Sequence, residues 1–179
     1  MEKSNKSEKG NIFLINGISG SGKTTLANKL KDYLKNKCRN VYIIDSDITR
    51  HFFDYDLNYS QEGRFVYFGR NAYGAYLLSE NGIDVIIAAN WNLKKMREIF
   101  KRKVDFIHIY LDVDVKDCIK NDPKGIYKKN MHLDKPGIPG IDIIFEKPED
   151  PDLILHPYKE TPEESFKKIV EFLIKNKKI

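Results

Sequence analysis

Apolar and polar positions alternate along the chain in a pattern of short buried strands and longer amphipathic helices. Apolar runs that end at a polar residue predict strands at Ile12–Ile15, Val41–Ile44, Asp84–Ala89, Phe106–Leu111 and Leu153–Leu155. Helices are expected between them, at residues 23–34, 60–80, 93–103 and 115–121, and again after Thr161. Strands alternating with helices indicate an α/β fold with a mainly parallel sheet.

The two ends of the chain and one internal segment depart from this pattern. Residues 1–10 are polar and are expected to form a disordered tail, which leaves 11–179 as a single domain. Residues 122–152 are rich in proline and carry scattered lysines, which predicts a long ordered loop or lid rather than a helix. Thr161 followed by Pro162 and Glu164 predicts the start of the last helix.

Charge and composition exclude several classes of protein. The 179 residues carry 31 Lys+Arg against 26 Asp+Glu, a net charge of +5. This mild excess suits anionic small molecules, but it lacks the dense basic stripe of a dedicated nucleic-acid binder. No apolar run is long enough to predict a membrane span, and Cys38 and Cys118 have no metal-ligand spacing. We expect a cytoplasmic protein with neither a nucleic-acid nor a membrane partner.

A glycine-rich segment between the first strand and the first helix fits the phosphate-loop pattern G-x-x-x-x-G-K-[ST]. Glycines let successive backbone N–H groups turn toward one phosphate, and the helix N-terminus adds partial positive charge. In such a loop Lys23 reaches the β- and γ-phosphates, and the Thr24 hydroxyl ligates Mg²⁺. The residues expected to bind ATP are Gly17, Ser19, Gly20, Ser21, Gly22, Lys23, Thr24 and Thr25. The predicted fold class is therefore a P-loop kinase-type three-layer sandwich with a basic lid.

Two aspartates and a lid lysine complete the predicted catalytic set of Lys23, Asp45, Asp47 and Lys124. Asp45 and Asp47 follow the second strand, where a parallel sheet delivers side chains beside the phosphate loop. We place Asp45 with Thr24 at the metal and Asp47 at the acceptor hydroxyl, and the reverse assignment of the aspartates stays open. The alternatives are a solvated strand end that caps the next helix, and a solvated lysine run in the lid.

These segments resemble the adenylyl-sulfate (APS) kinase family from about Phe13 to Leu155. The matching motifs are GISGSGKTTLA at 17–27, Asp-x-Asp-x-x-Arg at 45–50, Leu-x-Tyr-Ser-x-x-x-Arg at 57–64, DPKGIYKK at 122–129, Gly-Ile-Asp at 140–142 and Phe-Glu-x-Pro-Glu-x-Pro at 145–151. The resemblance implies an ATP- and Mg²⁺-dependent kinase that phosphorylates the ribose 3′-hydroxyl of a nucleotide with a 5′ anhydride tail. It also implies a homodimer. The acceptor-binding residues it suggests are Asp47, Arg50, Tyr59, Arg64, Tyr67, Arg70, Trp91, Lys124, Gly125, Ile126 and Ile138.

The sequence departs from the family mainly at the positions that bind the acceptor nucleotide in the family. Tyr67 replaces a substrate-binding Asn, Trp91 replaces the Ser of Ile-Ser-Pro, and Ile138 replaces a Phe that stacks on the acceptor base. Because the triphosphate motifs are intact, we expect a related nucleotide acceptor, with cytidine diphosphoramidate of capsule phosphoramidate biosynthesis as the candidate. The alternatives are an authentic adenylyl-sulfate kinase, a kinase of a small alcohol or polynucleotide end, and a catalytically silent nucleotide-binding protein.

Overall fold

Five parallel strands form one sheet in the order β2-β3-β1-β4-β5, which confirms the predicted α/β class. The strands are β1 (Ile12–Asn16), β2 (Val41–Asp45), β3 (Asp84–Ala89), β4 (Ile107–Leu111) and β5 (Leu153–Leu155). The computed structural model describes residues 9–53, 60–122, 124–134 and 137–179, apart from the side chains of Ser46, Asp47 and His51. Residues 1–8 of the predicted tail lie outside this part of the chain.

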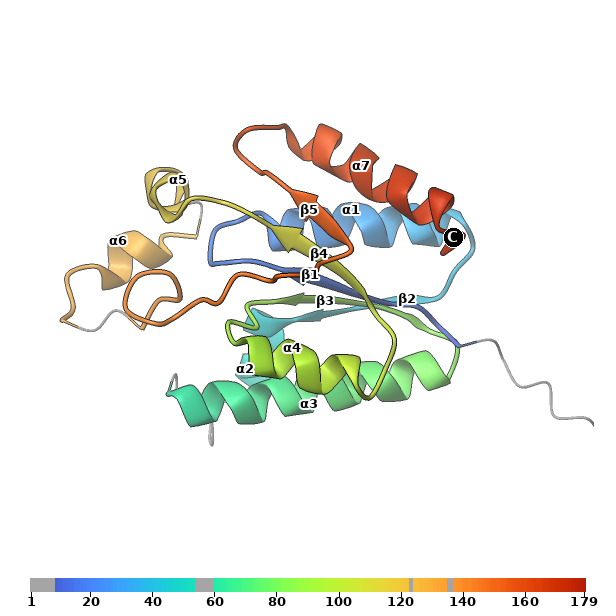
Figure 1. The fold of residues 1–179 in the computed structure, drawn as a ribbon, viewed down its shortest axis with the longest axis horizontal. Helices are drawn as coiled ribbons and strands as arrows, with labels where there is room; N and C mark the ends of the chain where they lie inside the picture. The colour runs from blue at the N-terminus through green and yellow to red at the C-terminus, as the bar shows by residue number, and fades with distance from the viewer. Residues whose placement is uncertain (1–8, 54–59, 123, 135–136) are drawn as a thin grey trace, which may run out of the picture.

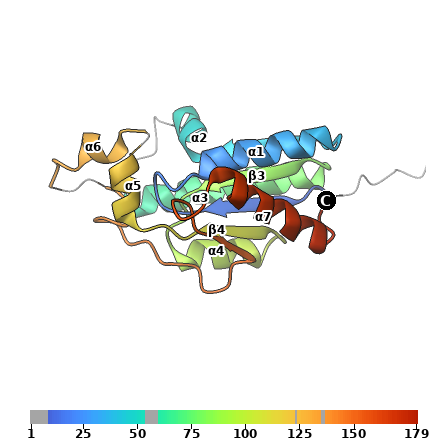
Figure 2. The ribbon, with the colours of Figure 1, turned by 90° about the horizontal axis from the view of Figure 1, so that it is seen from above.

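Helices cover both faces of the sheet, as Figures 1 and 2 show. The helices are α1 (Lys23–Asn36), α2 (Ser46–Phe52), α3 (Gln61–Glu80), α4 (Lys94–Lys101), α5 (Val115–Asn121), α6 (Ile126–Asn130) and α7 (Pro162–Lys175). Helices α1 and α7 pack on one face, and α3 and α4 pack on the other. The described helices include none with both the length and the apolar character that crossing a bilayer requires.

The alternation of side chains along β1 divides the core into two layers. Phe13 and Ile15 pack with Leu30 of α1, whereas Leu14 packs with Phe68 of α3. Successive side chains of a strand point to opposite faces, so a strand covered on both sides is mainly apolar. This is why β1, β3 and β4 are buried along their whole length.

Local signals set the helix boundaries. The Thr161 hydroxyl accepts a hydrogen bond from the Glu164 N–H, and the Glu164 carboxylate accepts one from the Thr161 N–H, which confirms the predicted start of α7. Ser60 caps α3 in a similar way through the Gly63 N–H. These contacts satisfy N–H groups that the first turn of a helix leaves without partners.

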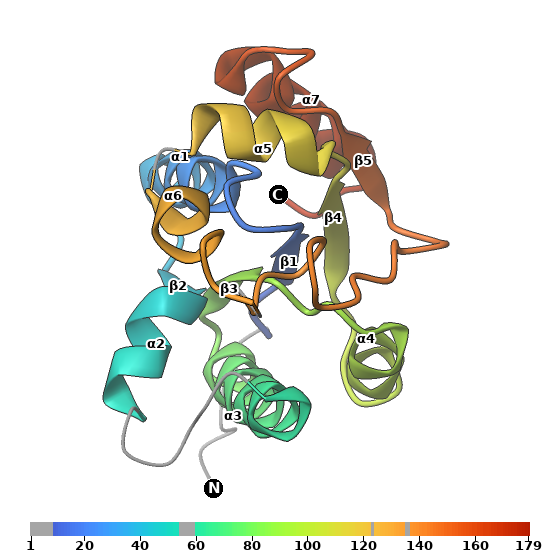
Figure 3. The same cartoon turned by 90° about the vertical axis from the view of Figure 1, so that its left-hand side faces the viewer.

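Helices α5 and α6 lie beyond the carboxyl ends of the strands (Figure 3). The helix α6 corrects the prediction that residues 122–152 contain no helix. Gly125 begins it with φ of 64°, a left-handed conformation that glycine adopts without steric cost. Tyr127 then packs with Ile18, Cys118 and Ile138, and this tertiary burial stabilises a helix too short to form alone.

A buried carboxylate ties the start of β3 to the turn before β2. Asp84 is 1% exposed, and it accepts hydrogen bonds of 2.8 Å from the Asn11 N–H and from Nη2 of Arg39. Replacing Arg39 by an uncharged residue would leave the buried Asp84 carboxylate without its guanidinium partner.

We expect Arg39→Ala to lower the free energy of unfolding by about 2 kcal/mol, because the buried charge loses its charge-assisted hydrogen bonds. Urea denaturation measures this change. The control is Lys101→Ala, which removes an exposed pair with Asp150 at 3.4 Å and should cost less than about 1 kcal/mol. Equal losses in the two variants would contradict this account of the Asp84 contact.

Candidate active site

The phosphate loop connects the buried end of β1 directly to the first turn of α1. Gly17 is closely packed, since a Cβ there would lie 2.7 Å from Oγ of Ser21 and 3.1 Å from Cβ of Leu111. Gly22 has φ of 94° and is the N-cap of α1, with no side-chain cap on the helix. The loop therefore presents backbone N–H groups at a helix N-terminus, the arrangement that binds phosphate.

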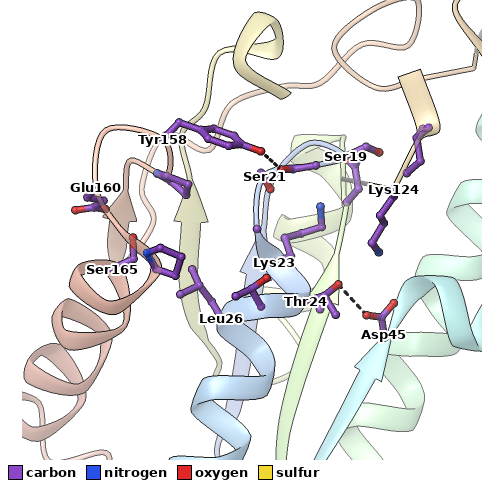
Figure 4. A pocket seen from close by; sticks show the side chains of 18 residues that line it. Ser19, Ser21, Lys23, Thr24, Leu26, Asp45, Lys124, Tyr158, Glu160 and Ser165 are labelled. Carbon is purple, nitrogen blue, oxygen red and sulfur yellow. Dashed lines mark hydrogen bonds between the residues drawn. The ribbon is translucent and has the colours of Figure 1, made fainter. Parts of the chain in front are cut away.

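Lys23 and Thr24 are the first two residues of α1 and lie next to the phosphate loop. Nζ of Lys23 donates a hydrogen bond of 2.6 Å to the carbonyl oxygen of Ile18, so its ammonium lies folded against the phosphate loop. The Thr24 hydroxyl donates to Oδ2 of Asp45 at 3.2 Å, as Figure 4 shows. The loop thus holds a cation beside a hydroxyl–carboxylate pair.

Thr24 and Asp45 fit the site expected for Mg²⁺. Their hydroxyl and carboxylate oxygens are hard ligands of the kind this ion prefers, and both residues line the cavity. Within the described residues, no group of three or more His, Cys, Asp or Glu side chains forms a protein-only metal site. Mg²⁺ commonly takes one or two protein ligands and completes its shell with water and phosphate oxygens.

A cavity of about 380 Å³ runs along the phosphate loop. Of the predicted site residues, the cavity is lined by Ser19, Gly20, Ser21, Gly22, Lys23, Thr24, Thr25, Asp45, Lys124 and Ile126. Lys124 enters from the lid on the side of Asp45 (Figure 4). The fold therefore brings three of the four predicted catalytic residues to one cavity. The fourth, Asp47, begins α2 with Ser46, and its side chain lies outside the described part of the chain.

The opposite end of the cavity was not predicted from the sequence. It is formed by the segment between β5 and α7 and by the start of α7, through Pro157, Tyr158, Glu160, Pro162 and Ser165. Tyr158 and Glu160 lie on this side in Figure 4. The sequence offered one signal for these residues, their position after the last predicted strand. Ligands of open α/β sheets bind at the carboxyl ends of the strands, and these residues follow the carboxyl end of β5.

The predicted acceptor arginines lie on α2 and α3 beside the lid. The Arg50 guanidinium lies 4.5 Å from the centre of the Tyr67 ring, and Tyr67 is 4% exposed. The Arg70 guanidinium lies at the same distance from the Phe53 ring, and Nη2 of Arg64 donates to the Gly137 carbonyl at 2.8 Å. These contacts join α2, α3 and the lid along one side of the sheet.

Several predicted acceptor residues do not reach the cavity. Trp91 is 2% exposed and packs edge-on against Phe68 and Phe100, because the segment after β3 turns into the core beneath α3 and α4. Ile138 is 3% exposed, since it fills the apolar cluster below the lid. Gly125 caps α6, and Tyr59 lies outside the described residues.

Comparison with known proteins identifies relatives over nearly the whole chain. The model of the family described as adenylylsulphate kinase matches residues 9–156. The adenylyl-sulfate kinase of Clostridium acetobutylicum is 33% identical over 95% of this chain and 86% of its own length. That of Halothermothrix orenii is 34% identical over 94% and 91%. An APS kinase structure from Mycobacterium tuberculosis, in complex with AMPPNP and APS, superimposes with a TM-score of 0.84 at 29% identity, over 92% of this chain and 98% of that one.

We expect Lys23→Ala to lower turnover by about 10²–10³-fold. The substitution removes the ammonium group at the phosphate loop, and this cation stabilises the negative charge of the phosphates. A coupled ADP-release assay measures the rate. Lys35→Ala, an exposed lysine on the same helix, is the matched control and should retain full activity. Normal turnover in Lys23→Ala would exclude this cavity as the phosphate site.

Proposed function

Because the chain belongs to the adenylylsulphate kinase family, we propose that it transfers the γ-phosphate of ATP to the ribose 3′-hydroxyl of a nucleotide with a modified 5′ tail. It is an ATP-dependent kinase that uses ATP and Mg²⁺. The observation that carries the proposal is the convergence of Lys23, Thr24, Asp45 and Lys124 on one cavity. Phosphoryl transfer requires little covalent chemistry from the protein, so placing these charges performs most of the catalysis.

Each of these groups has a separate task in the proposed reaction. The loop N–H groups and Lys23 hold the phosphates, and Thr24 with Asp45 would ligate Mg²⁺, which supplies charge neutralisation when bound. Lys124 approaches from the lid, where an ammonium helps to exclude water and stabilises charge on the transferred group. Asp47, two residues beyond Asp45, orients the acceptor hydroxyl and takes its proton.

The proposal of a nucleotide other than adenylyl sulfate rests on the predicted acceptor-binding residues. Tyr67 and Ile138 stand where the family has an Asn and a stacking Phe, and both are buried away from the cavity. Arg50, Arg64 and Arg70 supply cations for an anionic 5′ tail, although none of the three lines the cavity. We therefore propose cytidine diphosphoramidate, a capsule phosphoramidate precursor, as the acceptor.

Adenylyl sulfate is the second candidate, because the curated relatives with about one-third identity are adenylyl-sulfate kinases. The homodimer, the single domain and the cytoplasmic location expected from the sequence remain part of the proposal. A catalytically silent protein is disfavoured by the intact set of Lys23, Thr24, Asp45 and Lys124.

Substitutions of Asp45 and Asp47 should differ in their effect on the Mg²⁺ concentration that the enzyme requires. We expect Asp45→Asn to raise the Mg²⁺ concentration needed for half-maximal activity by about 10-fold, because the carboxylate ligand is lost. Asp47→Asn should leave that requirement unchanged and lower kcat by about 10²-fold, because the base is lost. Mg²⁺ titrations at saturating ATP measure both values, with the exposed Asp32→Asn as control. The opposite pattern would exchange the two roles.

Acceptor choice is measured as kcat/KM for the two nucleotides, with the product's phosphate position assigned by ³¹P NMR. We expect cytidine diphosphoramidate to be preferred by about 10-fold, because the buried Ile138 replaces the stacking Phe of the family and a purine base would lose about 0.5–1.5 kcal/mol of stacking. A preference for adenylyl sulfate would establish the second candidate. Phosphate at any position other than the 3′-oxygen would refute the proposed reaction.

A further inference from the structure

Two tyrosine hydroxyls hold consecutive carbonyl groups of the phosphate loop. Oη of Tyr127 donates to the carbonyl oxygen of Ser19 at 2.9 Å, and Oη of Tyr158 donates to that of Gly20 at 2.8 Å. Figure 4 shows Tyr158 reaching the loop from the side opposite to Lys124. Both bonds are long-range contacts, since 108 residues separate Tyr127 from Ser19 and 138 separate Tyr158 from Gly20.

Fixing these carbonyls also fixes the N–H groups that bind phosphate. In a trans peptide the C=O and N–H groups lie in one plane and point in opposite directions. When the Ser19 and Gly20 carbonyls point outward to the tyrosines, the N–H groups of Gly20 and Ser21 must point the other way. The Ser21 N–H donates a hydrogen bond of 3.3 Å to the carbonyl oxygen of Ile18, the same oxygen that Nζ of Lys23 contacts, so it points into the loop.

Close packing adds to the restraint on this part of the loop. A Cβ at Gly20 would lie 3.4 Å from Cβ of Cys118 and 3.6 Å from Cε2 of Tyr127, so α5 and α6 touch the loop directly. Gly20 also has φ of 76°, a conformation that glycine adopts readily. The peptide planes of the loop are therefore clamped by neighbours rather than by its own sequence alone.

The two tyrosines come from separate elements that are themselves fixed. Tyr127 is 1% exposed and follows Lys124 in the same lid segment, so its bond also sets the lid lysine relative to the loop. Tyr158 has φ of 73°, which a residue with a side chain adopts only where its surroundings hold it. Burial raises the pKa of both hydroxyls, which keeps them protonated as donors.

We propose that Tyr127 and Tyr158 are positioning residues that clamp the phosphate loop in its anion-binding shape. They act through the backbone of Ser19 and Gly20 and need no contact with the nucleotide base. The inference rests on the ATP site of the proposed function and is independent of the acceptor. The competing role for Tyr158 is to stack on the base of ATP, since Tyr158 also lines the cavity. In that role its substitution would weaken the binding of ATP but not of a ligand that has no base.

Inorganic tripolyphosphate separates these roles because it has phosphates but no base. Calorimetry in excess Mg²⁺ would give the dissociation constants of ATP and tripolyphosphate for Tyr127→Phe, Tyr158→Phe and the double variant. We expect each single variant to weaken both ligands by the same factor of about 3- to 10-fold, the effect of losing one hydrogen bond. In the double variant the losses should not simply multiply, because the two bonds hold adjacent peptides.

Matched controls separate positioning from general destabilisation. Tyr42→Phe removes a hydroxyl from a residue that is 57% exposed and should change neither dissociation constant. Tyr158→Phe alters a partly exposed ring, so it tests the proposal even if Tyr127→Phe fails to fold. In kinetics, KM for ATP should rise while KM for the acceptor stays constant.

Two outcomes would overturn the inference. Unchanged affinity for both ligands in folded Tyr158→Phe would show that the clamp is dispensable, and weaker ATP binding with unchanged tripolyphosphate binding would assign Tyr158 to the base. Failure of the wild-type protein to bind either ligand would instead refute the proposed function, and the inference with it.

Discussion

The site depends on the aim of a few backbone N–H groups in the loop between β1 and α1. A backbone donor can be aimed only by fixing the peptide plane that carries it, because it has no rotamer of its own. The fully buried β1 fixes one end of the loop, and Leu26 and Leu30 of α1 anchor the other in the core. Gly17 permits close approach to Leu111, so β4 also limits the path of the chain.

The rest of the site follows from what gathers around this loop. Parallel strands deliver their carboxyl ends to one edge of the sheet, so Asp45 from β2 meets Thr24 from α1. The lid adds Lys124 and Tyr127, and the segment after β5 adds Tyr158. Groups distant in sequence thereby share one cavity, and a restraint on any of them bears on the orientation of the phosphates.

The predicted acceptor-binding residues are organised differently, by side chains packed on one another. Arg50 lies over the Tyr67 ring, and Arg70 lies over the Phe53 ring, which places cations on aromatic surfaces between α2 and α3. The Arg64 bond to Gly137 links α3 to the lid. Substitution can change such contacts without disturbing the phosphate loop. This separation would allow a chain to keep the phosphate-loop motif of its family while its predicted acceptor-binding positions differ.

The sequence by itself determined the features that depend on neighbouring residues. Short runs of apolar residues located the five strands, and the Thr161 capping box located the start of α7. The phosphate loop was identifiable because its strand, glycines, lysine and helix are contiguous. Local hydrogen bonding and side-chain period act within a few residues, so they can be read along the chain.

Only the tertiary structure decided where loop side chains point. The apolar Ile138 and Trp91 turned into the core, because burying them against Ile18 and Phe68 is favourable and no local rule fixes a loop side chain. The short α6 formed where Tyr127 packs with Ile18, Cys118 and Ile138, and Tyr158 reached the phosphate loop from the segment after β5. The bonds of Tyr127 and Tyr158 to the phosphate loop join residues more than one hundred apart in the sequence, and such contacts exist only once the chain has folded.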